Sequence, residues 1–451
     1  MNLHFNTHVP AMQGSLFPDD KNAKRTRDNG TANKLSHNDK RFHDWYRFVL
    51  SFPPHLVREY IEQFDLKKGA TILDPFCGTG TTVVEAKLCG INSIGIEANP
   101  IAHFASSVKV AWDIDPYKLS EHARQIAVNV HKALASQQNS ALRTLPDDAF
   151  SLLLKDSISP LPLHKSLVLL DALKAEAHSP FHRHEMLALA KALVFFISNL
   201  HFGPEVGVRR TKKVDAPVVE SWLSEVSTIS SDLRIAQHSD TQAIIHHADS
   251  RQLSMILKPE SIDAVFTSPP YPNEKDYTRT TRLESVMFGF ITNRDDLRSL
   301  KKGLLRSNTR NVYKGDDDDS WIAGNTEIQK IASDIEDKRI ELGKTSGFER
   351  LYGKVTKLYF GGMARHLAEL RQYLKPGAYL GYVVGDQASY LQVMIRTGQL
   401  LSDIAQSLGY RVDRIDLFRT RLATATRKQL REEVVVLQWP GNRQGVNHGK
   451  G

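Results

Sequence analysis

Short apolar runs alternate with stretches of helical spacing along much of the chain. The strand-like runs are Ala70–Leu73, Asn92–Glu97, Ala243–Asp249, Ile262–Phe266, Tyr379–Asp386, Tyr410–Leu417 and Glu433–Trp439. Helical spacing is found between them, as in Val83–Leu88 and Lys357–Leu374. Strands that alternate with helices are typical of a parallel sheet covered by helices. The sequence therefore predicts an α/β fold on a mainly parallel seven-stranded sheet, with the last strand antiparallel.

Two long stretches interrupt this alternation. Within 112–237, apolar residues repeat at helical spacing in Leu119–Leu134, Glu185–Leu200 and Val218–Ile235, which predicts a helical insertion. Residues 292–348 are highly charged, and we expect them to be irregular. The expected order is a disordered tail at 1–40, core at 41–111, the helical insertion at 112–237, core at 238–290, a charged insertion at 291–355, the end of the core at 356–440 and a flexible tail at 441–451.

Two loops at the ends of predicted strands carry the candidate chemistry. The first is Asp74-Pro75-Phe76-Cys77-Gly78-Thr79-Gly80, and the second is Thr267-Ser268-Pro269-Pro270-Tyr271. At the carboxyl ends of parallel strands, both would face one crevice. Glycines 78 and 80 allow close backbone approach to a ligand, but neither the lysine of a phosphate loop nor the third glycine of a dinucleotide fingerprint follows. Glu97 ends the next strand about twenty residues later, where an acid can accept from a ribose diol.

These two loops resemble the cofactor loop and the catalytic loop of the S-adenosylmethionine-dependent amino-methyltransferases of DNA. The resemblance implies a Rossmann-like class I methyltransferase fold with S-adenosylmethionine as cofactor. It also implies that Asp74 binds the cationic amino group of the cofactor, while Asp249 accepts from its adenine amine. The residues expected to bind the cofactor are Asp74, Phe76, Gly78, Gly80, Thr81, Glu97 and Asp249. In this family the segment before the cofactor loop, which starts at Phe42, lines the methionine end; an aromatic packing segment is the alternative.

The second loop suits attack by an exocyclic amine, whose lone pair is delocalised into the base. Acceptors that hold the amine hydrogens out of the ring plane localise that lone pair, and the Ser268 hydroxyl and the Pro269 carbonyl can supply two. Pro270 stiffens the loop, and Tyr271 offers a face for stacking a base swung out of the duplex. Within the family, serine at the first position is commoner in cytosine-N4 enzymes and aspartate in adenine-N6 enzymes. We expect cytosine N4; adenine N6 and a catalytically inactive DNA-binding subunit of a defence complex stay open.

The charge of the chain suits a polyanionic partner. Lys and Arg number 59 against 51 Asp and Glu, for a net charge of +8. We expect double-stranded DNA as partner, with phosphates held by Lys301, Lys302, Arg306 and Arg310; a solvated charged loop is the alternative. Recognition of the target bases we assign to the helical insertion at 112–237. The cluster Val208–Lys213 is a solvated loop or another phosphate contact. A cognate restriction endonuclease or defence-system proteins are further candidate partners.

Cysteine usage and hydropathy narrow the class of protein further. Cys77 and Cys89 are too few for a disulfide framework or a four-cysteine zinc site, so we expect a reducing compartment and no metal. Carbon-5 cytosine methylation requires a thiolate, which follows proline in enzymes of that kind, and the chain has no Pro-Cys dipeptide. Neither a signal pattern nor an apolar run of membrane-spanning length is present, so the expected location is the cytoplasm, away from membranes.

Overall fold

The structure, a computed structural model, describes residues 39–48, 51–137, 140–203, 205–236, 240–273, 275–422 and 429–441. The predicted tails at 1–40 and 441–451 lie outside the described residues, apart from residues 39, 40 and 441. No helix in the described ranges is both long and apolar enough to cross a membrane.

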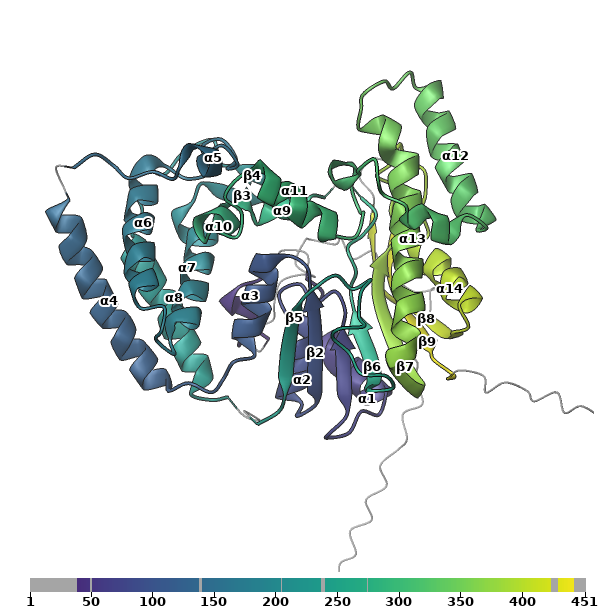
Figure 1. The fold of residues 1–451 in the computed structure, drawn as a ribbon, viewed down its shortest axis with the longest axis horizontal. Helices are drawn as coiled ribbons and strands as arrows, with labels where there is room; N and C mark the ends of the chain where they lie inside the picture. The colour runs from purple at the N-terminus through teal and green to yellow at the C-terminus, as the bar shows by residue number, and fades with distance from the viewer. Residues whose placement is uncertain are drawn as a thin grey trace, which may run out of the picture.

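A seven-stranded sheet with the strand order β5-β2-β1-β6-β7-β9-β8 forms the centre of the molecule (Figure 1). The strands are β1 (Thr71–Asp74), β2 (Asn92–Glu97), β5 (Ala243–His247), β6 (Ile262–Thr267), β7 (Leu374–Gly385), β8 (Arg411–Leu422) and β9 (Gln429–Gln438). Only β9 is antiparallel to its neighbours β7 and β8. The predicted fold class, a Rossmann-like sheet with an antiparallel last strand, is confirmed.

Helices cover both faces of the sheet because successive side chains of each strand point to opposite faces. Ile72 packs under α1 (Pro54–Gln63) and α2 (Thr81–Leu88), and α3 (Pro100–Lys109) lies beside them. The next residue, Leu73, points to the other face and packs with α13 (Tyr352–Leu370) and α14 (Thr397–Ser407). Short 3-10 turns, His43–Trp45 and Arg371–Tyr373, precede α1 and β7.

The insertion at 112–237 is helical but shares its core with the sheet. Its elements are α4 (Pro116–Ser136), α5 (Asp147–Phe150), α6 (Pro160–Ala175), α7 (His182–Ala192), a π turn (Leu193–Ile197), the hairpin strands β3 (Leu200–Phe202) and β4 (Val206–Val208), and α8 (Val218–Leu233). One apolar cluster runs from Val84 and Ile101 beside the sheet through Trp112 to Leu169 and Trp222. The insertion therefore extends the core at the β5 side of the sheet (Figure 1).

The expectation of irregular structure across 292–348 is wrong. After α9 (Tyr277–Thr280) and α10 (Arg282–Met287) the chain forms α11 (Arg294–Gly303), 3-10 turns at Thr309–Asn311 and Asp318–Ile322, α12 (Thr326–Glu341) and a turn at Glu349–Leu351. In α12, Ile328, Ile331 and Ile335 repeat at helical spacing and are buried. The isoleucine spacing is present in the sequence, but the many charged residues of the outer face led us to expect irregular structure.

The charged insertion is held on α13 by a close backbone approach. A Cβ on Gly361 would stand 1.9 Å from the carbonyl oxygen of Asp318, so only glycine lets the 318–322 turn lie directly on the helix. Nearer the start of α13, a Cβ on Gly353 would stand 2.9 Å from the carbonyl oxygen of Ala332 in α12. Two glycines thus allow the 318–322 turn and α12 to lie directly on α13.

Candidate active site

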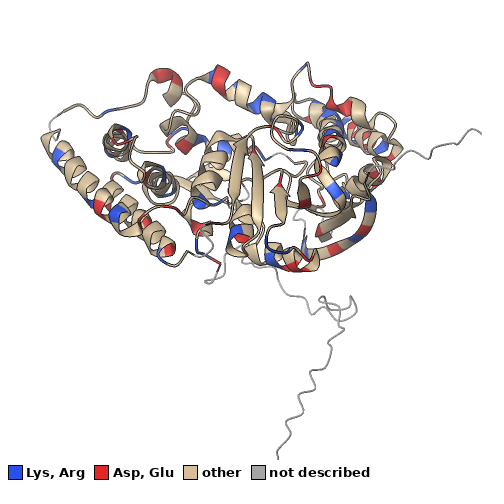
Figure 2. Ribbon diagram, turned by 60° about the horizontal axis from the view of Figure 1, so that its bottom comes forward, with Lys and Arg blue, Asp and Glu red and all other residues tan. Residues whose placement is uncertain are grey.

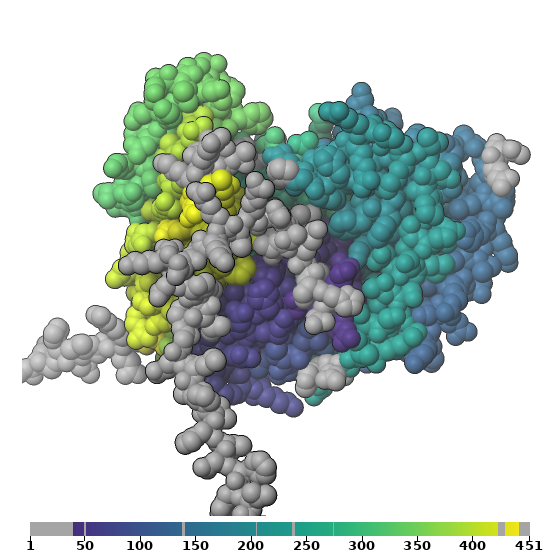
Figure 3. Space-filling view, turned by 180° about the vertical axis from the view of Figure 1, so that it is seen from behind, coloured from purple at the N-terminus to yellow at the C-terminus, as the bar shows by residue number. Residues whose placement is uncertain are grey.

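Both predicted loops line one cavity of about 510 Å³ at the carboxyl ends of the strands. Its walls include Phe76, Gly78, Glu97, Asp249, Ser268, Pro269, Pro270 and Tyr271, together with residues 303–305 of the charged insertion. The expectation that the loops face one crevice is confirmed. From behind, a notch separates the green and yellow segments that follow residue 300 from the teal helical insertion (Figure 3).

The cofactor loop turns the chain from β1 into α2 through left-handed backbone. Gly80 is the residue before α2 and has φ of 90°, and a Cβ there would stand 3.0 Å from the Cβ of Ser106. Phe76, Gly78 and Thr81 line the cavity, whereas Gly80 does not. Gly80 therefore shapes the turn, and its neighbours face the cavity.

Glu97 joins the end of β2 to the cofactor loop. Its Oε2 accepts a hydrogen bond from the Gly78 amide at 2.7 Å, and its Oε1 accepts one from the Asn99 amide at 2.7 Å. Burial raises the pKa of Glu97 to about 7, although these two amides oppose the shift. Because each carboxylate oxygen can accept more than one hydrogen bond, Glu97 can still accept from a ribose diol in the cavity.

Asp74 lies beneath the cavity wall rather than in it. Its Oδ1 accepts from the Thr267 hydroxyl at 2.6 Å and from the Phe76 amide at 3.2 Å, which ties the two loops together. Its Oδ2 is buried and has no hydrogen-bond partner among the described residues. Burial raises the pKa of Asp74 to about 6. An unpartnered buried carboxylate oxygen fits a cationic amino group, as the predicted cofactor would provide.

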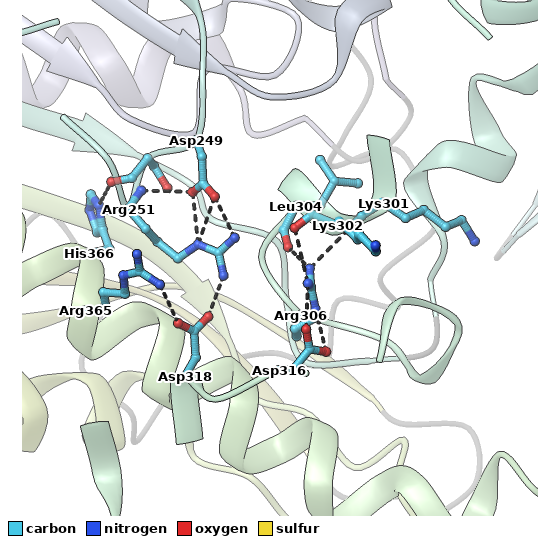
Figure 4. A network of polar contacts seen from close by, with 11 residues as sticks. Asp249, Arg251, Lys301, Lys302, Leu304, Arg306, Asp316, Asp318, Arg365 and His366 are labelled. Carbon is cyan, nitrogen blue, oxygen red and sulfur yellow. Dashed lines mark hydrogen bonds and ion pairs between the residues drawn. The ribbon is translucent and has the colours of Figure 1, made fainter. Parts of the chain in front are cut away.

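A buried arginine holds Asp249. The Arg251 guanidinium donates to both carboxylate oxygens of Asp249, at 2.9 Å and 2.6 Å. It also pairs with Asp318 of the charged insertion, which Arg365 contacts at 3.1 Å (Figure 4). Asp249 still lines the cavity, and its role at the adenine amine stays a proposal. Sequence reasoning did not identify Arg251, because nothing local links it to a residue 67 positions away.

The catalytic loop presents a fixed serine hydroxyl. Ser268 Oγ donates to the carbonyl oxygen of Val383 in β7 at 3.1 Å. This bond uses the only hydrogen of the hydroxyl, so its lone pairs remain available as acceptors. The Tyr271 ring packs against β7 at Gly385, where a Cβ would stand 3.0 Å from Tyr271 Cε2. Tyr271 and the prolines line the same cavity as Ser268.

The aromatic segment before α1 combines both alternatives. Phe48 and Phe52 line the cavity, so part of the segment faces the cavity. Phe42, Trp45 and Tyr46 are buried in the core, so the rest of the segment is structural.

Two of the four predicted phosphate contacts are buried in ion pairs. Lys301 Nζ lies 2.8 Å from Asp276. Arg306 binds both oxygens of Asp316 at 2.8 Å (Figure 4). Burial of Asp276 opposes its ionisation, but the Lys301 ammonium outweighs this and holds the pKa of Asp276 below its usual value. We correct the assignment: Lys301 and Arg306 hold the insertion together.

The other two predicted contacts, Lys302 and Arg310, are exposed. The basic cluster at 208–213 does not line the cavity; Arg209 and Lys213 donate to backbone carbonyl oxygens of Leu200 and Phe196. Lys, Arg, Asp and Glu are interspersed along the ribbon, so the net charge does not by itself locate a DNA surface (Figure 2).

Neutralising the exposed and the buried pair should have different consequences. Lys302→Gln with Arg310→Gln should lower the log–log salt slope of DNA binding by about 0.9 for each phosphate that the protein no longer neutralises, without unfolding the protein. Lys301→Gln should instead destabilise the fold by about 3 kcal/mol, because it leaves Asp276 buried and unpaired. Binding titrations over a range of salt and denaturant unfolding measure the two effects. An unchanged salt slope in the Lys302/Arg310 variant would show that neither residue contacts a DNA phosphate.

Cofactor binding should depend on pH through Asp74 and Glu97. Their pKa values are raised to about 6 and about 7, so both become carboxylates as the pH rises through this interval. Because the cofactor is cationic, its dissociation constant should fall through the interval and then level off. Raised pKa values favour the folded state at low pH, so the protein alone should lose stability as the pH rises from about 4, where these carboxyls ionise in the unfolded chain, to about 7, and S-adenosylmethionine should restore more of it at the upper end. Calorimetric and thermal-shift titrations test this; an affinity independent of pH would contradict it.

The sequence of the chain matches known DNA methylases. Residues 15–105, which include the cofactor loop and Glu97, match a family model described as DNA methylase. The Type II methyltransferase M.BsoBI of Geobacillus stearothermophilus is 26% identical over 442 residues, covering 88% of this chain and 86% of the relative. The Type II methyltransferase M.AvaI of a Nostoc strain is 24% identical over 437 residues, with the same coverage. M.MvaI of Kocuria varians is 25% identical over 61% of this chain and 68% of its own length.

The Rossmann-like sheet and the two loops have the arrangement expected of an S-adenosylmethionine-dependent methyltransferase. The sequence comparisons confirm the narrower resemblance to the DNA amino-methyltransferases, and with it S-adenosylmethionine as the cofactor and DNA as the substrate of the family.

Proposed function

We propose that this protein is a site-specific DNA methyltransferase that transfers a methyl group from S-adenosylmethionine to the exocyclic N4 amine of cytosine in double-stranded DNA. The observation that carries the proposal is the single cavity lined by Glu97 and Gly78 at one end and by Ser268 and Tyr271 at the other. A base must leave the duplex to reach such a site. The cavity volume suits a cofactor with one base at its reactive end.

Ser268 and Pro269 would prepare the amine for attack. With its hydrogen donated to the Val383 carbonyl, the Ser268 hydroxyl accepts from one amine hydrogen, and the Pro269 carbonyl accepts from the other. This draws the nitrogen lone pair out of conjugation with the ring. The bound cofactor supplies a methyl group on a sulfonium, and transfer in line with the sulfur–methyl bond depends on position more than on a covalent enzyme group.

Tyr271 would stabilise the charge that develops. Its ring face stacks the base and favours the cationic amine formed as the methyl group is transferred. Burial raises the pKa of the Tyr271 phenol, which therefore stays neutral at physiological pH. The amine attacks through its own lone pair, so no catalytic base is needed to start the reaction. The nitrogen–methyl bond forms as the sulfur–methyl bond breaks, and the cationic amine then loses one proton to water.

The relatives support a role in DNA modification. Three of them are named Type II methyltransferases, and we propose that this protein is the modification part of a restriction–modification or related phage-defence system. A cognate restriction endonuclease would then be its functional partner. Serine at position 268 favours cytosine N4 over adenine N6 by the resemblance to the family.

Identification of the methylated nucleoside tests the proposal. DNA incubated with the protein and labelled S-adenosylmethionine is digested to nucleosides, which are separated and identified by mass spectrometry. N4-methylcytosine supports the proposal, whereas N6-methyladenine would keep the fold and the site and change the acceptor. Absence of both, together with no calorimetric binding of S-adenosylmethionine, would favour the catalytically inactive DNA-binding subunit. Sequencing the product then gives the target sequence.

A further inference from the structure

The two ends of the cavity differ in charge. The cofactor end is lined by two acids, Glu97 and Asp249, whose oxygens can accept hydrogen bonds from a ligand. The end beside Tyr271 is lined by three cations that sequence reasoning did not identify. These are Lys275, which follows the catalytic loop, and Arg419 and Arg421 near the end of β8.

Only one acid, Glu432 of β9, balances Arg419 and Arg421 within the described residues. Arg419 Nε donates to Glu432 Oε2 at 2.6 Å, and Arg421 Nε lies 3.5 Å from Glu432 Oε1. Arg421 Nε is buried yet makes no hydrogen bond in the part of the chain that the structure describes. A carboxylate shared by two guanidinium groups leaves one positive charge in excess, with unsatisfied donor capacity on Arg421.

Lys275 adds a third positive charge to the same wall, where Glu205 lines the cavity as a second acid. In the described part of the chain its ammonium has no carboxylate within ion-pair distance. Lys275 and Arg421 line the same cavity. Burial lowers the pKa of Lys275 and the Arg421 guanidinium lowers it further, while Glu432 and Glu205 oppose the shift. Two like charges kept together in a partly buried site are costly unless an anion joins them.

This cationic cluster adjoins the place where a base would stack. At Gly385 of β7, an added Cβ would stand 3.0 Å from Tyr271 and 3.3 Å from Glu432, so the acid that holds both arginines is next to the catalytic tyrosine. A base stacked on Tyr271 brings its own sugar and phosphates to the mouth of the cavity, and those phosphates need a partner once the base has left the duplex.

We propose that Lys275, Arg419 and Arg421 bind a backbone phosphate of the nucleotide whose base enters the cavity. The inference rests on the proposed function and names its contact with DNA. Arg421 and Lys275 bind the phosphate directly through charge-assisted hydrogen bonds, and Glu432 fixes the plane of Arg419 beside them. A phosphate bound between the cations offsets their mutual repulsion. The site therefore favours the nucleotide that has rotated out of the duplex over the one that is still stacked in it.

Neutralising one phosphate at a time in the DNA tests this contact. The probe is a short duplex with the sequence found in the product analysis, in which single phosphates around the target base are replaced by uncharged methylphosphonates. With the native protein, one of these replacements should weaken binding about tenfold or more. With Arg421→Gln or Lys275→Gln, the same replacement should cost little further affinity, because these variants no longer hold that phosphate. Arg411→Gln is the matched control: it removes the same charge from the other end of β8.

The outcomes separate this inference from the proposed function. Suppose that the native protein methylates the duplex, and that each methylphosphonate lowers the DNA affinity of the Arg421 and Lys275 variants as much as that of the native protein. The proposed phosphate site is then wrong, while the proposed methyltransferase function stands. If the native protein methylates no DNA, the salt slope of binding to a mixed-sequence duplex still decides. A slope lower by about 0.9 in Arg421→Gln, but not in Arg411→Gln, supports the site, and equal slopes overturn it.

Discussion

Replacement of Ser268 by alanine should slow methyl transfer about a hundredfold while the affinity for S-adenosylmethionine stays the same. The Ser268 hydroxyl is directed by its hydrogen bond to the Val383 carbonyl, so its lone pairs are preorganised for the amine. An acceptor needed mainly in the transition state lowers kcat when it is removed, and loss of one preorganised hydrogen bond at comparable sites costs about a hundredfold or more. Single-turnover transfer of labelled methyl groups measures the rate, and calorimetry measures cofactor binding.

Ser389→Ala provides a matched control for this change. Ser389 lines the same cavity but lies outside the catalytic loop, so removal of its hydroxyl should leave the rate unchanged. Thermal unfolding of both variants checks that removal of the hydrogen bond to Val383 has not disturbed β6 or β7. Full activity of the Ser268 variant would show that the amine is prepared by another group.

Replacement of Asp74 by asparagine should weaken S-adenosylmethionine binding by at least about tenfold and leave the fold intact. The amide oxygen can still accept from Thr267 and Phe76, as Oδ1 does now. The unpartnered Oδ2 becomes an NH2 group, which cannot accept from the cationic amino group of the cofactor. A hydrogen bond between charged partners accounts for a loss of this size. Equilibrium binding by calorimetry is the measurement.

Glu97→Gln should differ from Asp74→Asn by disturbing the protein as well as its ligand. Both Glu97 oxygens accept from backbone amides, so a glutamine NH2 must oppose the amide of Gly78 or Asn99. We therefore expect weaker cofactor binding together with lower thermal stability. Asp65→Asn is the control for both, because Asp65 is exposed and asparagine tolerates its left-handed φ of 52°. Unchanged cofactor affinity in both Asp74→Asn and Glu97→Gln would remove these two residues from the cofactor site.

Local patterns along the chain were enough to locate the central sheet and both loops. Apolar runs of strand length separated by helices predicted the strands, because the burial of both sheet faces leaves a local signature. Asp74–Gly80 and Thr267–Tyr271 were recognisable for a related reason: their glycines and prolines impose backbone geometry within a few residues. The prediction of irregular structure at 292–348 was wrong because the helical spacing of the isoleucines in Ile328–Ile335 was overlooked among the surrounding charged residues.

Only the tertiary structure shows which charged side chains are available to bind a ligand. Lys301 and Arg306 look like free cations in the sequence, yet Asp276 and Asp316 neutralise them. Arg421 and Lys275 are separated by almost 150 residues in the chain, and the sheet brings them to one wall of the cavity. Periodicity reports burial because burial repeats locally along a helix or strand. An ion pair depends on two side chains that meet only in the folded protein, and the local sequence around each residue does not indicate which residue is its partner.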